Sequence, residues 1–351
     1  MYAVIDMGSN TMRLGIYHNE DGNFKQFFHK KEMVGLAGYV KDGFLTDEGI
    51  EAAASVLKEF GTIVRNLGIE HVMVFATASL RNVENTEEAA VRLWQMTGFK
   101  IHVISGEEEA KLDFKGAVSQ IRTRDGILVD IGGGSTEIVT FYDKTVLDAL
   151  SIPVGSLSLF KKHVKRILPK DEERAKIRGI VNKQLNDSGL MIMKLESGQL
   201  AGIGGSIRAI GRLYRHFYEL PEECNVMEVK KLKKMYRQMA EKKNGKWQLI
   251  LKLCPDRIHT LIPGFLILLT IIERYEIETV VISRCGLREG YLMEYAKEET
   301  AQKETVGEEA ATAQDEQEQA EDMNQDMDQD QAESQDQTDD QSQPEVGDQA
   351  E

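Results

Sequence analysis

Residues 130–137, with the sequence Asp-Ile-Gly-Gly-Gly-Ser-Thr-Glu, constrain the fold of this chain more than any other segment. Three consecutive glycines lack a Cβ atom, so their backbone N–H groups can approach an anion closely. Residues 127–131 are apolar except for Asp130 and are typical of a buried strand, and residues 137–140 resume an extended pattern. The segment is therefore predicted to be a β-hairpin whose tip cradles phosphate.

The side chains at this tip indicate what binds together with phosphate. Hydroxyl donors follow the glycines, while Asp130 and Glu137 place one carboxylate at each end. Carboxylates commonly hold Mg²⁺ together with the phosphates of a substrate. The segment thus predicts a phosphate and a hard cation, although an ordinary glycine turn is the simpler alternative. The predicted cradle comprises Gly132, Gly133, Gly134, Ser135 and Thr136.

The same design occurs a second time near the N-terminus. When Asp6 is aligned with Asp130, residues 4–11 overlie residues 128–135. Either segment alone could be a glycine turn, but an acid at the same place in both favours a duplicated domain. In this alignment Arg13 corresponds to Glu137. An arginine can make bidentate contacts to phosphate. Ser9, Asn10 and Arg13 are expected to face the cleft between the two hairpins.

Hydrophobic periodicity predicts alternating helices and strands along the rest of the chain. Thr46 is the predicted N-cap of the first helix, and Gly68 is its predicted stop. The predicted helices cover 47–67, 86–97, 156–167, 171–187 and 287–296, and the predicted strands cover 71–76, 100–104, 146–152, 200–203 and 279–282.

Three adjacent acids follow Ser105 at the start of another predicted helix. With Ser105 as N-cap, Glu108 takes the reciprocal position of a capping box, and Glu107 is expected to face water. Glu109 is left as the candidate general base, because neighbouring like charges raise a carboxyl pKa toward the range useful for proton abstraction. The alternative is that all three acids serve only the helix dipole.

Five motifs, taken in order, resemble the Ppx/GppA family of exopolyphosphatases and guanosine pentaphosphate phosphohydrolases. They are AVIDMGSNTMRLGI at 3–16, ATASLR at 76–81, SGEEEA at 105–110, DIGGGSTE at 130–137 and GLREGYL at 286–292. The resemblance covers residues 3–297. It implies an α/β, two-domain fold of the actin, Hsp70 and sugar-kinase (ribonuclease H-like) type, with the active site in the interdomain cleft.

The resemblance also implies roles for individual residues. Glu109 stands where the family has its catalytic glutamate, and Ser79 and Arg81 stand where the family contacts the phosphate chain. A capping serine in a turn is the alternative for Ser79. Mg²⁺ or Mn²⁺ is the implied cofactor, with Asp6, Asp130 and Glu137 as its ligands. Further phosphate-binding candidates are Gly204, Gly205 and Ser206 of a third glycine loop, and Arg257.

The sequence departs from the family pattern at residues 256–259. Arg257 fits the usual Arg-Ala-Asp pattern, but His259 stands where an acid is expected. That acid's contribution to substrate or metal binding is therefore in doubt, and a surface histidine is the alternative. The helical HD-type extension of longer family members has no counterpart in this sequence.

The acidity of the chain is concentrated at its end. The net charge is −15, yet residues 301–351 hold 18 Asp and Glu against one Lys, so the rest is about neutral. This tail contains no Phe, Trp, Tyr, Ile or Leu and is expected to be disordered. The predicted domains are residues 1–122, completed by the helix at 286–299, residues 123–285, and the tail at 300–351.

Other sequence features indicate the cellular location of the protein and the kinds of partner it has. Cys224, Cys254 and Cys285 form neither a disulfide framework nor a zinc motif. A first strand directly after Met1 and the short apolar run at 261–272 favour a cytoplasmic protein with no membrane partner. The basic stretch at 230–246 is either a solvated face or a track for a linear polyanion. It lacks the interleaved aromatic residues expected of a nucleic-acid site.

The predicted function is exopolyphosphatase activity, in which Glu109 activates a water that attacks the terminal phosphate. Guanosine pentaphosphate is the alternative substrate. The sequence also leaves open a kinase or ATPase of the same fold, and a sensor that binds polyphosphate or guanosine pentaphosphate without catalysis. The resemblance leaves a homodimer open.

Overall fold

The computed structural model describes residues 1–20, 23–190, 195–240 and 246–297, and Met1–Glu294 form one unit. The strands are β1 (Tyr2–Met7), β2 (Thr11–Glu20), β3 (Asn23–Met33), β4 (Val40–Lys41), β5 (Phe44–Leu45), β6 (His71–Ala76), β7 (His102–Val103), β8 (Asp125–Ile131), β9 (Thr136–Tyr142), β10 (Thr145–Ile152), β11 (Gln199–Ile203), β12 (Val226–Glu228) and β13 (Thr279–Ile282).

The α-helices are α1 (Asp47–Asn66), α2 (Ala78–Arg81), α3 (Thr86–Thr97), α4 (Gly106–Ala117), α5 (Ser156–His163), α6 (Asp171–Asp187), α7 (Gly204–Phe217), α8 (Val229–Ala240), α9 (Gln248–Leu253) and α10 (Leu261–Arg274). The 3₁₀ helices are η1 (Leu36–Tyr39), η2 (Val118–Gln120) and η4 (Pro255–Arg257). A final helix begins at residue 287.

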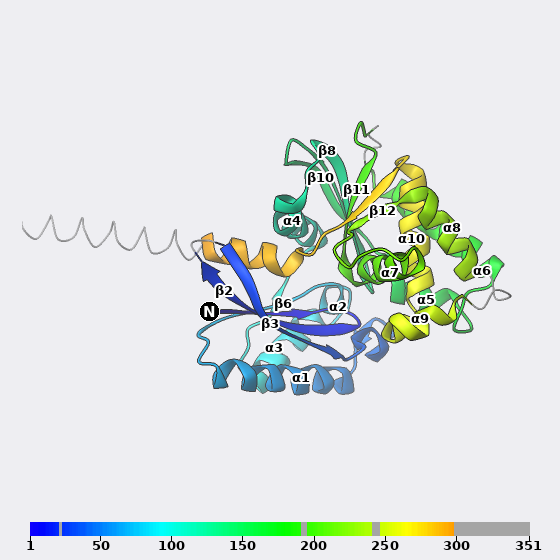
Figure 1. The fold of residues 1–351 in the computed structure, drawn as a ribbon. Coiled ribbons are helices and arrows are strands. Elements are labelled where there is room, and N and C mark those ends of the chain that lie inside the picture. Colours follow the sequence, from blue (N-terminus) through cyan, green and yellow to red (C-terminus); the bar gives the residue numbers. More distant parts are fainter. Residues whose placement is uncertain (21–22, 191–194, 241–245, 298–351) are drawn as a thin grey trace, which may run out of the picture. The chain divides into compact units, whose positions relative to one another are not determined.

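Two larger sheets repeat one design (Figure 1). The first has the order β3-β2-β1-β6-β7, and the second has the order β10-β9-β8-β11-β13-β12. In each, an antiparallel meander of three strands is followed by a parallel neighbour of its first strand. Asp6 pairs with Arg13 in one hairpin, and Asp130 pairs with Glu137 in the other. The predicted alignment of the two hairpins is confirmed.

Local capping sets where α1 and the site-bearing helix α4 begin. The Thr46 side chain accepts a hydrogen bond from the Gly49 N–H at the start of α1. At the start of α4, Ser105 accepts from the Glu108 N–H at 3.1 Å, and the Glu108 side chain accepts from the Ser105 N–H at 3.4 Å. The predicted capping box is confirmed, so the direction of α4 follows from its own sequence.

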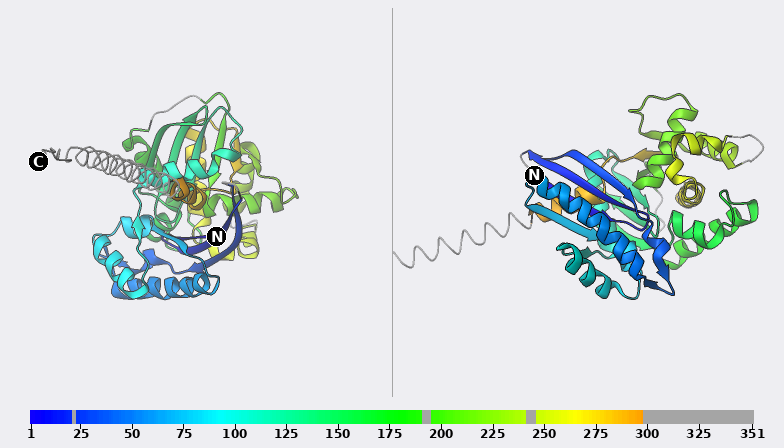
Figure 2. Two further views of the ribbon diagram at one scale, coloured as in Figure 1. Left: turned by 90° about the vertical axis from the view of Figure 1, so that its left-hand side faces the viewer. Right: turned by 90° about the horizontal axis from the view of Figure 1, so that it is seen from below.

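Each sheet has its own hydrophobic core. Leu57 and Phe60 of α1 are fully buried in the core of the first sheet. In the second sheet, α4 covers one face through Phe114, while α7 and α10 cover the other (Figure 1). Two views agree that α6 and α8 lie on the far side of α7 and α10 from the second sheet (Figure 2). The final helix reaches the first sheet, since the Tyr17 hydroxyl donates to Glu289 at 2.6 Å.

Some predictions about the elements need correction. The strand predicted at 100–104 contains only His102–Val103, and α5 ends at His163 rather than near residue 167. The edge strand β3 was not predicted, because its charged residues hide any alternation of apolar and polar side chains. The predicted domain boundaries stay a prediction, and the acidic tail lies outside the described residues.

Candidate active site

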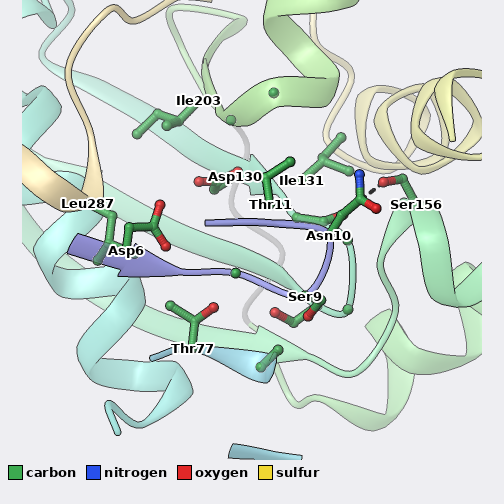
Figure 3. A pocket seen from close by; sticks show the side chains of 18 of the residues that line it. Asp6, Ser9, Asn10, Thr11, Thr77, Asp130, Ile131, Ser156, Ile203 and Leu287 are labelled. Atoms are coloured by element: carbon green, nitrogen blue, oxygen red, sulfur yellow. Dashed lines mark hydrogen bonds between the residues drawn. The ribbon is translucent and has the colours of Figure 1, made fainter. Parts of the chain in front are cut away.

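The tips of the two glycine hairpins line one cavity of about 100 Å³ (Figure 3). In each tip the first glycine donates to the carbonyl oxygen three residues later, Gly8 to Thr11 at 3.1 Å and Gly132 to Ser135 at 3.0 Å. The tips pack closely, because a Cβ atom on Gly134 would lie 2.8 Å from Ser9 Oγ and 3.2 Å from Ala78 Cβ.

The start of α5 fixes the orientation of the second tip. The N–H of Ser156 donates to the Gly132 carbonyl at 2.9 Å, and the N–H of Leu157 donates to the Gly133 carbonyl at 3.0 Å. These bonds hold the tip carbonyls toward α5 and leave the amide side of the loop for an anion.

Two aspartates face the cavity from the ends of β1 and β8. Asp6 and Asp130 point toward one another across it (Figure 3). Burial raises the pKa of both carboxyls, and nearby arginines oppose that shift. Gly204 closes the wall behind Asp130 with a φ of +83°, and a Cβ atom there would lie 1.9 Å from Asp130 Oδ1. Only glycine fits both requirements at this position.

A cluster of arginines also lines the cavity and makes part of its wall cationic. Its members are Arg13, Arg208, Arg257 and Arg288. Burial, reinforced by the charge of Arg13, lowers the pKa of Arg208 to about 10. The same two causes lower the pKa of Arg257. Among the described residues, the only carboxylate within salt-bridge distance of the cluster is Asp6, 3.7 Å from Arg13. The cluster thus holds positive charge that an anion would balance.

Glu109 of α4 also lines the cavity and is 7% exposed. Arg81 holds it from behind, with 2.6 Å between Arg81 Nη1 and Glu109 Oε2. Arg81 also lies 3.8 Å from Glu137, whose carboxylate accepts from the Ser151 hydroxyl at 2.8 Å. Burial, together with the charge of Glu137, raises the pKa of Glu109 well above its usual value, against the opposing effect of Arg81. Burial, and then Asp130, raise the pKa of Glu137 to about 7.

Most of the predicted site residues line this cavity. They are Asp6, Ser9, Asn10, Arg13, Glu109, Asp130, Gly132, Gly133, Gly134, Ser135, Gly204, Gly205 and Arg257.

The structure places five other predicted residues behind the wall. Ser79 donates to the Met7 carbonyl, and Thr136 donates to the Val154 carbonyl at 2.6 Å. Ser206 is fully buried and lies 3.4 Å from the Ser156 hydroxyl. Arg81 and Glu137 also lie behind the wall. Arg81 forms a salt bridge with Glu109 and also lies 3.8 Å from Glu137.

Sequence reasoning missed Arg208 and Arg288. Arg288 lies inside the motif at 286–292, which was the signal available for it. Arg208 follows the third glycine loop by one helical turn, and only the packing of α7 brings it to the cavity.

Two other sequence features lie away from the cavity. His259 is exposed and packs on Phe160, with 4.9 Å between the ring centroids. The basic stretch begins on α8, where Lys231 pairs with Glu228 on the surface. Its described part lines neither the cavity nor the groove beside it.

The oxygen ligands in the cavity are of the kind that Mg²⁺ or Mn²⁺ prefers. Within the described ranges there is no group of three or more His, Cys, Asp or Glu side chains that could hold a metal by itself. Mg²⁺ does not require such a group, because it usually binds one or two carboxylates together with substrate phosphates and water. Asp6 and Asp130 fit that role, whereas Glu137 does not line the cavity.

The fold defines an α/β protein of the actin-like two-domain class, and its cavity brings together two glycine tips, two aspartates and four arginines. The sequence model of the Ppx/GppA phosphatase family matches residues 15–299. The chain belongs to this family, as predicted. Phosphatases of this family generally depend on a divalent metal.

Curated relatives carry two names. A putative exopolyphosphatase of Haemophilus influenzae is 28% identical over 299 residues, which cover 84% of this chain and 91% of that protein. A guanosine-5'-triphosphate,3'-diphosphate pyrophosphatase of Pseudoalteromonas translucida is 28% identical over 301 residues, 83% of this chain and 58% of that protein. The chain therefore spans a little over half the length of the second relative.

Solved structures show the same fold. The Ppx/GppA enzyme of Aquifex aeolicus has a TM-score of 0.68 and 26% identity, covering 84% of this chain and 98% of that one. An exopolyphosphatase from Cytophaga hutchinsonii has a TM-score of 0.74 at 21% identity, covering 83% and 96%. The predicted fold class and the predicted enzyme class, a hydrolase of phosphoric anhydrides, are confirmed. Among the described residues, no helix has the length and apolarity needed to cross a membrane.

Proposed function

We propose that this phosphoric-anhydride hydrolase removes the terminal phosphate from inorganic polyphosphate. The observation that carries the proposal is the position of Glu109, a buried carboxylate that lines the same cavity as a cluster of arginines. A base and an anion site that share one cavity are the two parts that hydrolysis of a phosphate anhydride needs.

The terminal phosphate would bind between the two hairpin tips. Arg13 and the amides of the second tip contact its oxygens, and the remaining arginines bind the following phosphates. A water molecule between Glu109 and the phosphorus loses a proton to the Glu109 carboxylate. Its oxygen forms the new bond to phosphorus as the bridging P–O bond breaks, and the shortened chain leaves with the bonding electrons.

The neighbours of Glu109 set its proton affinity. Burial and Glu137 raise its pKa and make it a stronger base, while Arg81 opposes that shift and favours the ionised form. Arg81 and Glu137 are thus positioning residues rather than phosphate or metal ligands. A bound Mg²⁺ or Mn²⁺, held by Asp6 and Asp130, would neutralise charge on the phosphate oxygens.

The shape of the site favours an inorganic chain over a nucleotide. Among the described residues that line the cavity, none is Phe, Tyr or Trp. A guanine base would have no aromatic side chain to stack on. Guanosine pentaphosphate is the second candidate substrate, because one relative carries the name of that activity. A cytoplasmic location is proposed as well, since Cys224, Cys254 and Cys285 are free thiols.

The test is phosphate release by the purified full chain from polyphosphate and from guanosine pentaphosphate, with Mg²⁺ present or chelated. We expect release from polyphosphate with the higher kcat/KM, loss of release on chelation, and recovery on adding Mg²⁺. Binding of either ligand without release would favour the non-catalytic sensor. A higher kcat/KM on guanosine pentaphosphate would reverse the order of substrates.

A further inference from the structure

Arg288 lines the cavity without a salt bridge to hold it there. Among the described residues, no carboxylate lies within salt-bridge distance of its guanidinium. Burial lowers the pKa of Arg288, but the nearby Tyr17, Glu289 and Asp6 outweigh that effect and raise it. Arg288 is the second residue of the final helix. Its place in the cavity therefore depends on the groups that fix the start of this helix.

Glu289 fixes the start of the final helix through a capping bond. Its Oε2 atom accepts a hydrogen bond from the Gly286 N–H at 2.9 Å. Gly286 directly precedes the first helical residue, so Glu289 takes the third helical position, where a glutamate side chain commonly caps the backbone. Gly286 has no side chain that could supply the other half of a capping box. The helix start therefore depends on Glu289.

Tyr17 anchors Glu289 to the first sheet. The hydroxyl of this fully buried residue of β2 donates to Glu289 Oε1 at 2.6 Å. A Cβ atom on Gly15 would lie 2.8 Å from Tyr17 Cε2, so the ring lies over Gly15 and extends toward the cavity end of the strand. Gln26 of β3 donates to the same hydroxyl at 3.3 Å, which leaves the Tyr17 proton for Glu289. Both oxygens of Glu289 thus accept hydrogen bonds from the protein.

We propose that Tyr17 and Glu289 are positioning residues that hold Arg288 against the substrate phosphate in the cavity. This inference rests on the proposed function and deepens it, because it adds two residues that act through Arg288. The contacts run from β2 through the Tyr17 hydroxyl and the Glu289 carboxylate to the start of the helix that carries Arg288. A long arginine side chain loses conformational entropy on binding an anion, so fixing its helix beforehand raises the affinity.

The experiment measures binding of tripolyphosphate to the full-length protein by calorimetric titration with Mg²⁺ chelated. Arg288→Gln should weaken binding roughly tenfold or more, because a charge-assisted contact is lost. Tyr17→Phe keeps the ring and removes only the hydroxyl, and it should weaken binding roughly three- to tenfold. The decisive variant combines both substitutions. If Tyr17 acts through Arg288, the double variant should bind with the affinity of Arg288→Gln alone.

Glu289→Gln tests the other positioning residue with an opposite expectation for the alternative. A carboxamide has one acceptor oxygen, so it cannot accept from Tyr17 and Gly286 through separate oxygens. Glu289→Gln should therefore weaken tripolyphosphate binding and have no further effect when Arg288→Gln is already present. A Glu289 carboxylate that only repels phosphate across the cavity would give tighter binding on neutralisation, and that result would overturn the role of Glu289.

The matched control is Tyr214→Phe. Tyr214 is also buried, and its hydroxyl accepts a hydrogen bond from the Glu228 N–H at 3.1 Å, but it does not line the cavity. We expect this variant to bind tripolyphosphate like the wild type. A Tyr17→Phe protein that matches this control would overturn the proposal, and so would a double variant in which the losses from Tyr17→Phe and Arg288→Gln multiply.

The titration separates this proposal from the proposed function. If the wild type binds tripolyphosphate but releases no phosphate from any substrate, the proposed function fails, and the variants still decide whether Tyr17 acts through Arg288. If the wild type does release phosphate, Tyr17→Phe should raise KM and leave the acidic limb of the pH profile, which Glu109 sets, unchanged. A wild type that does not bind tripolyphosphate would overturn both proposals.

Discussion

Replacing Arg81 with glutamine tests whether the buried pair with Glu109 controls the chemistry. Arg81 is 18% exposed in its side chain and Glu109 is 9% exposed, with 2.6 Å between their charged atoms. Removing one partner of such a buried pair costs roughly 3 to 5 kcal/mol, because the other charge is left without compensation. The pKa of Glu109, which Arg81 lowers, should rise further once that opposing charge is gone.

Two assays follow from these shifts. In urea unfolding, Arg81→Gln should lose roughly 3 kcal/mol at neutral pH. The loss should grow as pH rises, because a raised folded-state pKa means that stability falls as the carboxyl ionises. In the pH profile of kcat/KM, the acidic limb should move to higher pH, since the base stays protonated longer.

An exposed pair provides the control. Arg92 lies 2.5 Å from Asp47, but the side chains are 34% and 74% exposed, so Arg92→Gln should change stability far less than Arg81→Gln. Adding Glu109→Gln to Arg81→Gln should restore stability, because the uncompensated charge is then gone. The reasoning is refuted if Arg81→Gln is as stable as Arg92→Gln and keeps the wild-type acidic limb.

Three further predictions concern single substitutions, two at buried positions beside the site and one at an exposed position of α6. Burial, and then the charge of Asp130, raise the pKa of Asp113 well above its usual 3.8, so its contribution to stability falls as pH rises. Asp113→Asn should remove up to about 1.4 kcal/mol per pH unit from that dependence, as measured by urea unfolding between about pH 5 and pH 8; an unchanged slope would contradict this. Gly204→Ala should cost at least about 1 kcal/mol through its left-handed backbone and should lower kcat by displacing Asp130. Gly179→Ala in α6, where no described atom lies within 4 Å of the added methyl group, should instead stabilise by about 0.5 to 1 kcal/mol, as thermal unfolding would show.

Features that depend on a few neighbouring residues were predictable from the sequence. Glycine spacing and the repeated acid predicted both hairpins and the equivalence of Asp6 and Asp130 within them. The spacing of Ser105 and Glu108 predicted the capping box, which turns Glu109 toward the cavity. These predictions succeeded because turn and cap geometry is local.

Features that depend on packing between distant segments were not predictable. Arg208 and Arg288 reach the cavity only because α7 and the final helix meet there. Arg81 was predicted to contact phosphate, and the structure shows its guanidinium donating to Glu109 at 2.6 Å, a contact between α2 and α4 that the sequence did not reveal. The groove beside the cavity is likewise lined by both Lys31 of β3 and Arg212 of α7. No sequence spacing could reveal that these two elements lie close together.

The measurement that tests the central claim most directly is steady-state phosphate release from polyphosphate by Glu109→Gln beside Glu107→Gln. Both substitutions neutralise one acid of α4, but Glu107 is exposed and pairs with Lys111 at 2.6 Å. If Glu109 is the general base, its variant should lose a factor of roughly 10² to 10⁴ in kcat and still bind polyphosphate, while the Glu107 variant keeps wild-type kcat. A Glu109→Gln protein with wild-type kcat would contradict the account.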